Sequence, residues 1–381
     1  MNSILIAPNS FKECAYSTET AEIIFKSLEK YLIRFHQKTT LVKFPVADGG
    51  DGFLNVIKEH FNTETLFFKI PSLIGEAIND CPVEYSFEKR TLYIESAQAI
   101  GLKLAPPEKR NPLVLNSGPL GKLLLEIDNK VKKNELKVEK VIIGIGGTAT
   151  NDLGAGFLSC FGLKLYDKNG EILSPVPARF LQAEKIEMPK VKLNYEVQVV
   201  LDVENPLLGE TGASRVFAKQ KGAGEKGVRL LEEGFGRLLN LMNIEDEQVL
   251  RFSGAGGGIA AAFQLFFGAE TISSERFILD FLNLASLKNE FSLVITGEGA
   301  LDSQTFMNKG AMIVYSFFRK FGLPVCFICG ENKLSNKPDF LDIIELKNFF
   351  KNKEESIKNF TAGIDMACRE IVNKYSKNLK G

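Results

Sequence analysis

The chain has 381 residues, and its 47 Lys and Arg residues balance 47 Asp and Glu residues, so the formal net charge at pH 7 is zero. Such a balance implies no basic face, which argues against a nucleic-acid partner. No apolar run approaches the roughly 20 residues that span a bilayer, and the first residues do not resemble a signal peptide. We therefore expect a cytoplasmic protein without a membrane partner, large enough for two α/β domains or one enlarged domain.

The six cysteines and two histidines offer little metal or redox chemistry. Cys326 and Cys329 have CxxC spacing, but they lie inside the apolar segment VCFIC, which favours buried thiols. His36 and His60 each stand alone on an expected helix, which disfavours a His-ligated zinc site or a Ser-His-Asp triad. The chemistry must come from other residues.

Strands and helices alternate at both ends of the chain. A strand at 3–7 precedes a helix that starts at Ser17 or Thr18, and a strand at 41–46 precedes the loop ADGGDG and another helix. From about residue 66 short strand-like pieces and turns indicate an inserted second domain. Helical apolar stripes follow near 120–127 and 228–242, and the alternation returns with strands at 293–296 and 325–329.

Four apolar, β-branched runs end in loops that mix glycines with carboxylates, at 46–52, 141–152, 199–207 and 293–305. Strands of this kind present their polar loops at the carboxyl edge of an α/β sheet, where ligands bind. Glycine lets backbone N–H groups approach phosphate, and carboxylates hold a metal ion or accept a proton. The four loops together predict phosphate chemistry.

The loop GIGGTATND at 144–152 is the first candidate for anion binding. A helix beginning there would direct free N–H groups at an anion, while the alternative is a tight turn with a capping aspartate. The same loop matches GxGxxA after a strand, which leaves an NAD-dependent dehydrogenase as an alternative function. The chain contains no GxxxxGK[ST] motif, so a P-loop is excluded.

The glycine run at 254–258 opens a second apolar helix and is a further anion site or a close packing surface. Between these loops, Arg215, Lys219 and Lys221 are cations suited to a triphosphate or to a developing phosphoryl charge. Phosphoryl transfer also needs carboxylates for Mg²⁺ and for the acceptor hydroxyl. Four carboxylates stand at strand ends: Asp48, Asp152, Asp202 and Glu298.

The order of motifs resembles the bacterial glycerate kinases that make 2-phosphoglycerate. The resemblance covers roughly residues 3–331 and rests on these segments: IAPNSFKE, ADGGDG, ESAQAIGL, NSGPLGKLL, IIGIGGTATNDLGAG, LDVENPLLGETGAS, VFAKQKGA, GAGGG, LVITGEGALDSQT and CFICGE. It implies a kinase that uses ATP with Mg²⁺ and D-glycerate as the acceptor. The product's regiochemistry stays open at this point, as does the oligomeric state, for which a homodimer is the working expectation.

The resemblance also implies an architecture of two α/β domains. The first would be a Rossmann-like, three-layer parallel sheet built from both chain ends, 1–66 and 285–381. The second, 67–284, would be inserted, although the assignment of 137–155 is open. The active site would lie in the cleft, where closure excludes water.

Functional residues follow from the matching motifs. The catalytic candidates are Asp48 for the acceptor hydroxyl, with Lys12 and Arg215 for the charges of glycerate or γ-phosphate. The metal candidates are Asp202 and Glu298. The candidates for binding substrate or phosphate are Asn9, Ser10, Gly49, Gly50, Gly144, Gly146, Gly147, Thr148, Asn151, Asp152, Lys221, Gly254, Gly256, Gly257, Gly258 and Gln304.

Several positions depart from the family pattern. Asn9 stands where Asp is usual, Phe53 where Thr is common, and 218–220 and 308–311 differ from the usual GPQ and Gly-Lys-x-Pro. A neutral Asn keeps one acceptor oxygen and gains a donor, so it can replace a carboxylate as a hydrogen-bonding group. These departures leave a second alternative function, a non-catalytic relative that binds a metabolite.

Overall fold

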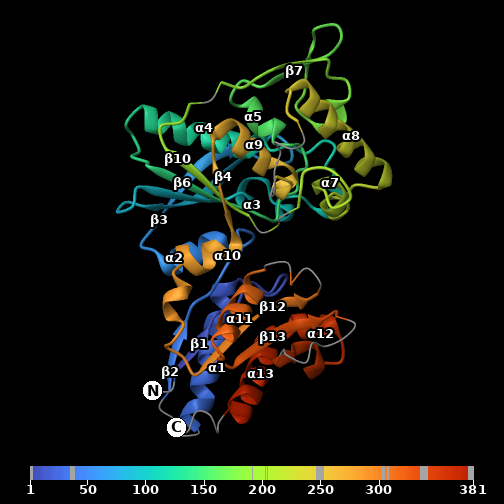
Figure 1. Ribbon diagram of the computed structural model, residues 1–381. Helices are drawn as coiled ribbons and strands as arrows, with labels where there is room; N and C mark the ends of the chain where they lie inside the picture. The colour runs from blue at the N-terminus through green and yellow to red at the C-terminus, as the bar shows by residue number, and fades with distance from the viewer. Residues whose placement is uncertain are drawn as a thin grey trace. The chain divides into compact units, whose positions relative to one another are not determined.

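The computed structural model describes residues 3–34, 39–190, 192–201, 203, 205–245, 253–302, 305–306, 309–334 and 342–375. The chain divides into two compact units (Figure 1). The terminal unit comprises Met1–Asp48, Lys58–His60 and Ser274–Gly381, and the central unit comprises Gly49–Ile57 and Phe61–Ser273. Parallel strands alternate with helices in both, so the α/β class is confirmed.

The described part of the terminal unit contains a five-stranded sheet with the order β14-β13-β12-β1-β2 and only parallel pairings. Its strands are β1 (Ser3–Ile6), β2 (Thr40–Lys43), β12 (Leu293–Leu301), β13 (Val325–Asn332) and β14 (Asp342–Glu345). Its main helices are α1 (Ser17–Arg34), α10 (Ser274–Arg276), α11 (Gly310–Lys320), α12 (Lys353–Lys358) and α13 (Phe360–Tyr375).

Helices cover both faces of this sheet. On one face α1 and α13 lie side by side and pack on Ile4 and Ile328 in one buried apolar cluster (Figure 1). Phe327 points to the opposite face, because successive side chains of a strand alternate, and its ring lies 6.5 Å from that of Tyr315 on α11. The expected three-layer, Rossmann-like arrangement is therefore present.

The strand order reverses between β1 and β12. From β1 the chain passes through α1 to the neighbouring β2, whereas from β12 it passes through α11 to β13 on the other side. In open parallel sheets the crevice for a ligand forms at such a switch point, outside the carboxyl ends of the two strands. In the terminal unit, a ligand is therefore expected near the residues that follow β1 and β12.

The described part of the central unit contains a six-stranded sheet with the order β11-β10-β6-β5-β4-β3, parallel from β11 to β5 and antiparallel from β5 to β3. Its strands are β3 (Glu64–Pro71), β4 (Ile78–Ser86), β5 (Thr91–Glu95), β6 (Lys140–Ile145), β10 (Glu196–Leu201) and β11 (Glu270–Ser273). A smaller sheet joins β7 (Lys164–Tyr166), β8 (Ile172–Leu173) and β9 (Lys185–Glu187).

The helices of this part of the chain are α2 (Phe53–His60), α3 (Ala97–Ile100), α4 (Gly118–Lys132), α5 (Ala155–Ser159), α6 (Pro177–Phe180), α7 (Ala213–Phe217), α8 (Glu225–Leu241) and α9 (Ile259–Phe267). The two predicted apolar stripes are confirmed. Leu120 and Ile127 of α4 and Leu231 and Phe235 of α8 are completely buried, which is expected for one apolar face at helical spacing.

The units divide at positions other than the expected domain bounds of 66 and 284. The chain leaves the terminal unit after Asp48 and returns to it at Ser274, apart from the last turn of α2. Strand β3 begins at Glu64 and pairs with β4, which carries it into the central sheet. Residues 137–155, whose assignment was open, include β6 and lie within the central unit.

The histidine and cysteine interpretations agree with the structure where they are described. Cys326 and Cys329 are buried thiols, and burial raises the pKa of Cys326 well above its usual range. The ring of His60 packs against that of Phe44 in a tilted arrangement. Its Nε2 hydrogen-bonds the carbonyl of Pro45 at 2.9 Å, and burial lowers the pKa of His60. His36 lies outside the described residues. Among the described helices, none has the length and apolar character needed to cross a membrane.

Candidate active site

The carboxyl edge of the terminal sheet brings together three predicted residues. Asn9 follows β1, Asp48 follows β2, and Glu298 lies in β12, so two of them flank the switch point. The backbone N–H of Asn9 donates to the carbonyl of Gly297 at 2.9 Å, and its side-chain Nδ2 donates to Asp48 Oδ2 at 3.0 Å. Residues far apart in the sequence thus form one polar cluster, because parallel strands end at the same edge.

Glu298 has the most perturbed environment in this cluster. It is 6% exposed, and its Oε1 has no hydrogen-bond partner in the described part of the chain. Burial raises the pKa of Glu298 to about 7; Lys309 and a hydrogen bond from Thr305 lower it, and the charges of Asp48 and Asp302 raise it. A buried carboxylate with an unpartnered oxygen is costly unless a cation pairs with it.

The donor set fits a magnesium ion. Among the described residues no group of three or more His, Cys, Asp or Glu side chains could hold a metal ion by itself. Mg²⁺ usually takes only one or two carboxylates and fills its shell with water and substrate phosphates, so the buried carboxylate of Glu298 is compatible with such an ion. The other metal candidate, Asp202, lies outside the described residues, as does Gln304.

Lys12 and Ser10 lie in the segment that follows β1. Ser10 is half-buried, and its backbone N–H donates to Asn9 Oδ1 at 2.8 Å. The side chain of Lys12 is exposed in a turn closed by the bridge between Phe11 and Ala15. Lys12 is thus a solvated cation within three residues of Asn9.

In the central unit the second half of the ADGGDG loop packs on the carboxyl edge of β6 and β10. A Cβ atom on Gly144 would lie 2.6 Å from the carbonyl oxygen of Gly49, and a Cβ on Gly49 would lie 2.8 Å from the carbonyl oxygen of Val200. Gly50 is buried in the same loop and accepts a hydrogen bond from Phe53 N at 3.1 Å. These glycines therefore allow backbone to pack directly on backbone.

Replacing Gly144 with alanine is expected to destabilise the protein by about 1 to 3 kcal/mol, because the new methyl group overpacks this contact. Urea unfolding measures the loss. The matched control is Gly236→Ala in α8, where a Cβ would meet nothing within 4 Å and alanine should stabilise the helix by about 0.5 to 1 kcal/mol. Equal unfolding free energies for wild type and Gly144→Ala would contradict the close contact.

The loop after β6 has the geometry of the capping alternative. Asp152 is completely buried; its Oδ2 accepts from Ser117 N at 2.8 Å, Ser117 Oγ at 2.7 Å and Gly156 N at 3.0 Å, and its Oδ1 from Gly154 N at 3.3 Å. Burial raises the pKa of Asp152, and these donors lower it. Asp152 therefore holds the loop to α4 and α5, and both of its carboxylate oxygens accept hydrogen bonds from within the protein.

The helix expected to begin at this loop starts only after Asp152. Strand β6 ends at Ile145, and the next helix, α5, begins only at Ala155 and has five residues. In a dinucleotide-binding fingerprint the glycine turn leads straight into a helix whose N-terminus faces the pyrophosphate. The loop that contains Gly146 and Gly147 lacks that helix and so lacks its dipole.

Other predicted residues meet around Lys221. This lysine is 3% exposed, and its Nζ donates to the carbonyl of Thr150 at 2.6 Å and to Thr148 Oγ1 at 3.2 Å. Asn151 Nδ2 donates to Ser214 Oγ at 3.1 Å, whereas its Oδ1 is buried without a partner in the described residues. Thr148, Asn151 and Lys221 are therefore brought together and join the β6 loop to the segment around α7.

The glycine run at 254–258 packs on the same loop. A Cβ on Gly257 would lie 2.4 Å from the carbonyl oxygen of Thr150, and one on Gly254 would lie 2.3 Å from that of Pro206. Gly256 and Gly258 have φ values of 64° and 92°, in the left-handed region that favours glycine. The close-packing alternative accounts for these glycines without a ligand.

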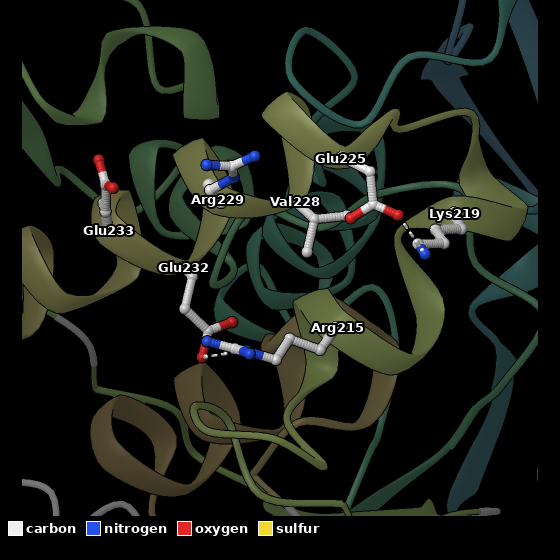
Figure 2. Close-up of a pocket in the computed structure, with 7 residues that line it drawn as sticks. All are labelled: Arg215, Lys219, Glu225, Val228, Arg229, Glu232 and Glu233. Carbon is white, nitrogen blue, oxygen red and sulfur yellow. Dashed lines mark ion pairs between the residues drawn. The ribbon is translucent and has the colours of Figure 1, made fainter.

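Arg215 lines a pocket of about 530 Å³ on α7 and α8 (Figure 2). The pocket is lined almost wholly by charged side chains: Arg215, Lys219, Glu225, Val228, Arg229, Glu232 and Glu233. Figure 2 shows Arg215 directed at Glu232, with Nε 3.9 Å from Oε1, and Lys219 is 2.5 Å from Glu225. These two cations have carboxylate partners, so an anion at this pocket would compete with those pairs.

The comparisons with known proteins agree with the motif order. Residues 4–376 match the glycerate kinase family. The chain belongs to the glycerate kinase family. It is 35% identical over 342 residues to a glycerate kinase of Halalkalibacterium halodurans, covering 87% of this chain and 86% of that relative. It is also 35% identical over 335 residues to the glycerate 2-kinase of Escherichia coli K12, covering 86% and 85%.

A solved structure supports the same family membership. A crystal structure of a protein assigned as glycerate kinase 2 in Salmonella typhimurium LT2 matches with a TM-score of 0.75 and 29% identity, covering 100% of both chains. Neither this structure nor the two relatives supports the dehydrogenase alternative.

Two further carboxylates of this chain, Asp51 and Glu95, were not among the site residues predicted from the sequence. Asp51 lies 2.9 Å from Lys103 Nζ, and a Cβ on Gly147 would lie 2.9 Å from its Oδ1. Glu95 accepts from Leu54 N at 3.2 Å at the start of α2. The signal was present, because Asp51 is the second aspartate of ADGGDG and Glu95 opens ESAQAIGL.

Proposed function

We propose that the chain catalyses the ATP-dependent, Mg²⁺-assisted phosphorylation of D-glycerate to 2-phosphoglycerate. The observation that carries the proposal is the cluster of Asn9, Asp48 and Glu298 at the carboxyl edge of the terminal sheet, in a chain of the glycerate kinase family. It offers a hydrogen-bond acceptor for a hydroxyl group and a buried carboxylate for a cation. Phosphoryl transfer to an alcohol needs both.

In this proposal Asp48 accepts the hydrogen bond of the glycerate hydroxyl and orients it toward the γ-phosphate. Asp48 is half-buried, and one of its oxygens is occupied by Asn9, which leaves Oδ1 for the acceptor. Full proton removal contributes little to a loose phosphoryl transition state, so positioning is the main effect.

Glu298 holds the magnesium ion, with Asp202 proposed as a second ligand. When bound, the ion neutralises charge on the phosphate oxygens during transfer. Lys12, a solvated cation close to Asn9, pairs with the carboxylate of glycerate or with the transferred phosphoryl group. Arg215, in the central unit, is a further proposed anion-binding residue, and an anion there would compete with its pairing with Glu232.

The central unit has its own candidates for anion binding. The candidates are the N–H groups of the Gly49–Gly50 and Gly146–Gly147 segments and the hydroxyl of Thr148, which already accepts a hydrogen bond from Lys221. Backbone donors recognise phosphate and carboxylate alike, so these loops fit either ATP or glycerate.

A coupled assay tests the proposal. ADP release that depends on both D-glycerate and Mg²⁺ would support a glycerate kinase, and direct coupling to enolase would identify the product as 2-phosphoglycerate, since 3-phosphoglycerate first needs a mutase. Binding of glycerate without ADP release would favour the metabolite-binding alternative. Nicotinamide reduction with NAD and a hydroxy acid would favour a dehydrogenase.

The proposal places the enzyme in the cytoplasm, where its ATP would be available. For the oligomeric state we keep the homodimer as the prediction. Sedimentation would confirm it with a mass near twice the chain mass of 42.2 kDa and would contradict it with a mass of one chain.

A further inference from the structure

Both polar atoms of the Asn9 side chain have hydrogen-bond partners inside the protein. Asn9 is 4% exposed, its Oδ1 accepts from Ser10 N at 2.8 Å, and its Nδ2 donates to Asp48 Oδ2 at 3.0 Å. The backbone N–H of Ser10 can only donate, so it fixes which end of the amide carries the oxygen. The nitrogen end must then face Asp48.

The surroundings hold this pair in place from two more sides. A Cβ on Gly310, at the start of α11, would lie 3.0 Å from Asn9 Nδ2, so the backbone of α11 closes over the amide. Ser274 Oγ donates to the backbone carbonyl of Asp48 at 3.0 Å. The Asp48 carboxylate is therefore anchored at its backbone and at Oδ2, while Oδ1 remains for a ligand.

We propose that Asn9 is a positioning residue, which orients the Asp48 carboxylate toward the acceptor hydroxyl through Nδ2 and does not itself contact substrate. This inference rests on the proposed function, and it revises the expectation that Asn9 binds substrate directly. The assignment follows from the hydrogen bonds, because both polar atoms of the amide already have partners within the protein.

The neutral amide suits a site that is already rich in negative charge. The charges of Asp48 and Asp302 raise the pKa of Glu298, and the charge of Lys309 lowers it. A carboxylate at position 9 would stand about as close to Asp48 as the amide does now, and like charges at that distance share a proton. Asparagine donates the hydrogen bond at every pH without adding a charge.

The variants Asn9→Ala and Asn9→Asp test this role through pH profiles. We expect Asn9→Ala to lower kcat by about 10 to 100-fold, with the KM for ATP unchanged, because a misplaced acceptor costs that much. Asn9→Asp should keep substantial turnover near pH 5.5, where a protonated aspartic acid donates O–H in place of N–H. Its kcat should then fall relative to wild type as the pH rises and the two carboxylates repel.

The matched control is Asn348→Asp. Asn348 Nδ2 also donates to a carboxylate, Glu345 Oε2, at 3.3 Å, but this pair is exposed to water. The kcat of Asn348→Asp should follow the wild-type pH profile. A constant ratio of Asn9→Asp to wild-type kcat across the pH range, or a wild-type kcat for Asn9→Ala, would overturn the inference.

A stability measurement separates this inference from the proposed function. In Asn9→Asp, burial and the neighbouring Asp48 raise the pKa of the new carboxyl in the folded state above its unfolded value. Its stability relative to wild type is then greatest below pH 4 and declines as the pH rises. Urea unfolding should show this decline for Asn9→Asp and not for Asn348→Asp. If Asn9→Asp shows no such decline, Asn9 does not contact Asp48. If the wild type releases no ADP in the presence of glycerate, only the proposed function is contradicted.

Discussion

The Glu298→Gln variant is expected to lose turnover by at least about 100-fold while becoming more stable above pH 7. Glutamine keeps the shape of the side chain but removes the charge that holds the metal ion in our proposal, and charge stabilisation of this kind is worth several kcal/mol in a transition state. The steady-state kcat at saturating Mg²⁺ measures the loss. Raising the Mg²⁺ concentration should restore little of it.

The stability gain follows from the pKa of the buried carboxyl. In the folded state the pKa is raised to about 7 from its ordinary value of 4.5, so the folded protein binds more protons than the unfolded chain between these values. The stability of the wild type relative to the variant is therefore greatest below about pH 4.5 and falls as the pH rises to 7. Glutamine removes this loss, which amounts to about 3 kcal/mol at most.

Urea unfolding at pH 5 and pH 8, with a chelator present, checks this prediction. The control is Glu331→Gln on β13, where Lys347 lowers the pKa of an accessible carboxyl, so the substitution should bring no gain at pH 8. Equal unfolding free energies of wild type and Glu298→Gln at pH 8 would show that Glu298 carries no burial penalty. Full activity of Glu298→Gln would remove it from the metal site.

The second large effect is expected for Asp48→Asn, whose kcat should fall by about 100-fold with a small change in the KM for ATP. The amide would present its N–H to the donor Asn9 Nδ2, or to the acceptor hydroxyl, and either arrangement loses a hydrogen bond that orients the nucleophile. Positioned acid or base groups contribute about 10² to 10⁴ to rate, and we expect the lower end because the transition state is loose.

Initial rates with varied glycerate and ATP separate the effects on kcat and KM. Asp80→Asn provides a control, since Asp80 is an exposed residue of β4 that lies opposite Lys69 of β3. The control should match wild type. If Asp48→Asn turns over at the wild-type rate, Asp48 does not orient the acceptor hydroxyl, and the proposed role fails.

The sequence predicted elements well where the pattern was local and periodic. The stripe that includes Leu120 and Ile127 became a buried helix face, and the strands at 3–7, 293–296 and 325–329 became three neighbouring strands of one parallel sheet. Helical and strand periodicity are set by residues a few positions apart, so they can be read without the fold.

The loop after β6 continues well past its glycines before α5 begins at Ala155. Glycines after a strand predict a tight turn into a helix, but the chain instead continues through Thr148 and Asn151, which hydrogen-bond to Lys221 and Ser214. These partners lie more than 60 residues away. No local pattern signals such contacts, so the sequence could not distinguish a ligand loop from a structural one.

By itself the sequence determined the family, the α/β class and the strand ends that carry carboxylates, because motif order and periodicity are local properties of the chain. Only the tertiary structure decided which of those residues meet. The pairing of β1 with both β2 and β12 places Asn9 against Asp48 and leaves Glu298 buried at the same edge. Asp152 has the same sequence signature as Asp48, yet it is completely buried and its oxygens accept hydrogen bonds from Ser117, Gly154 and Gly156. The difference arises from hydrogen-bond partners that only the packed fold supplies.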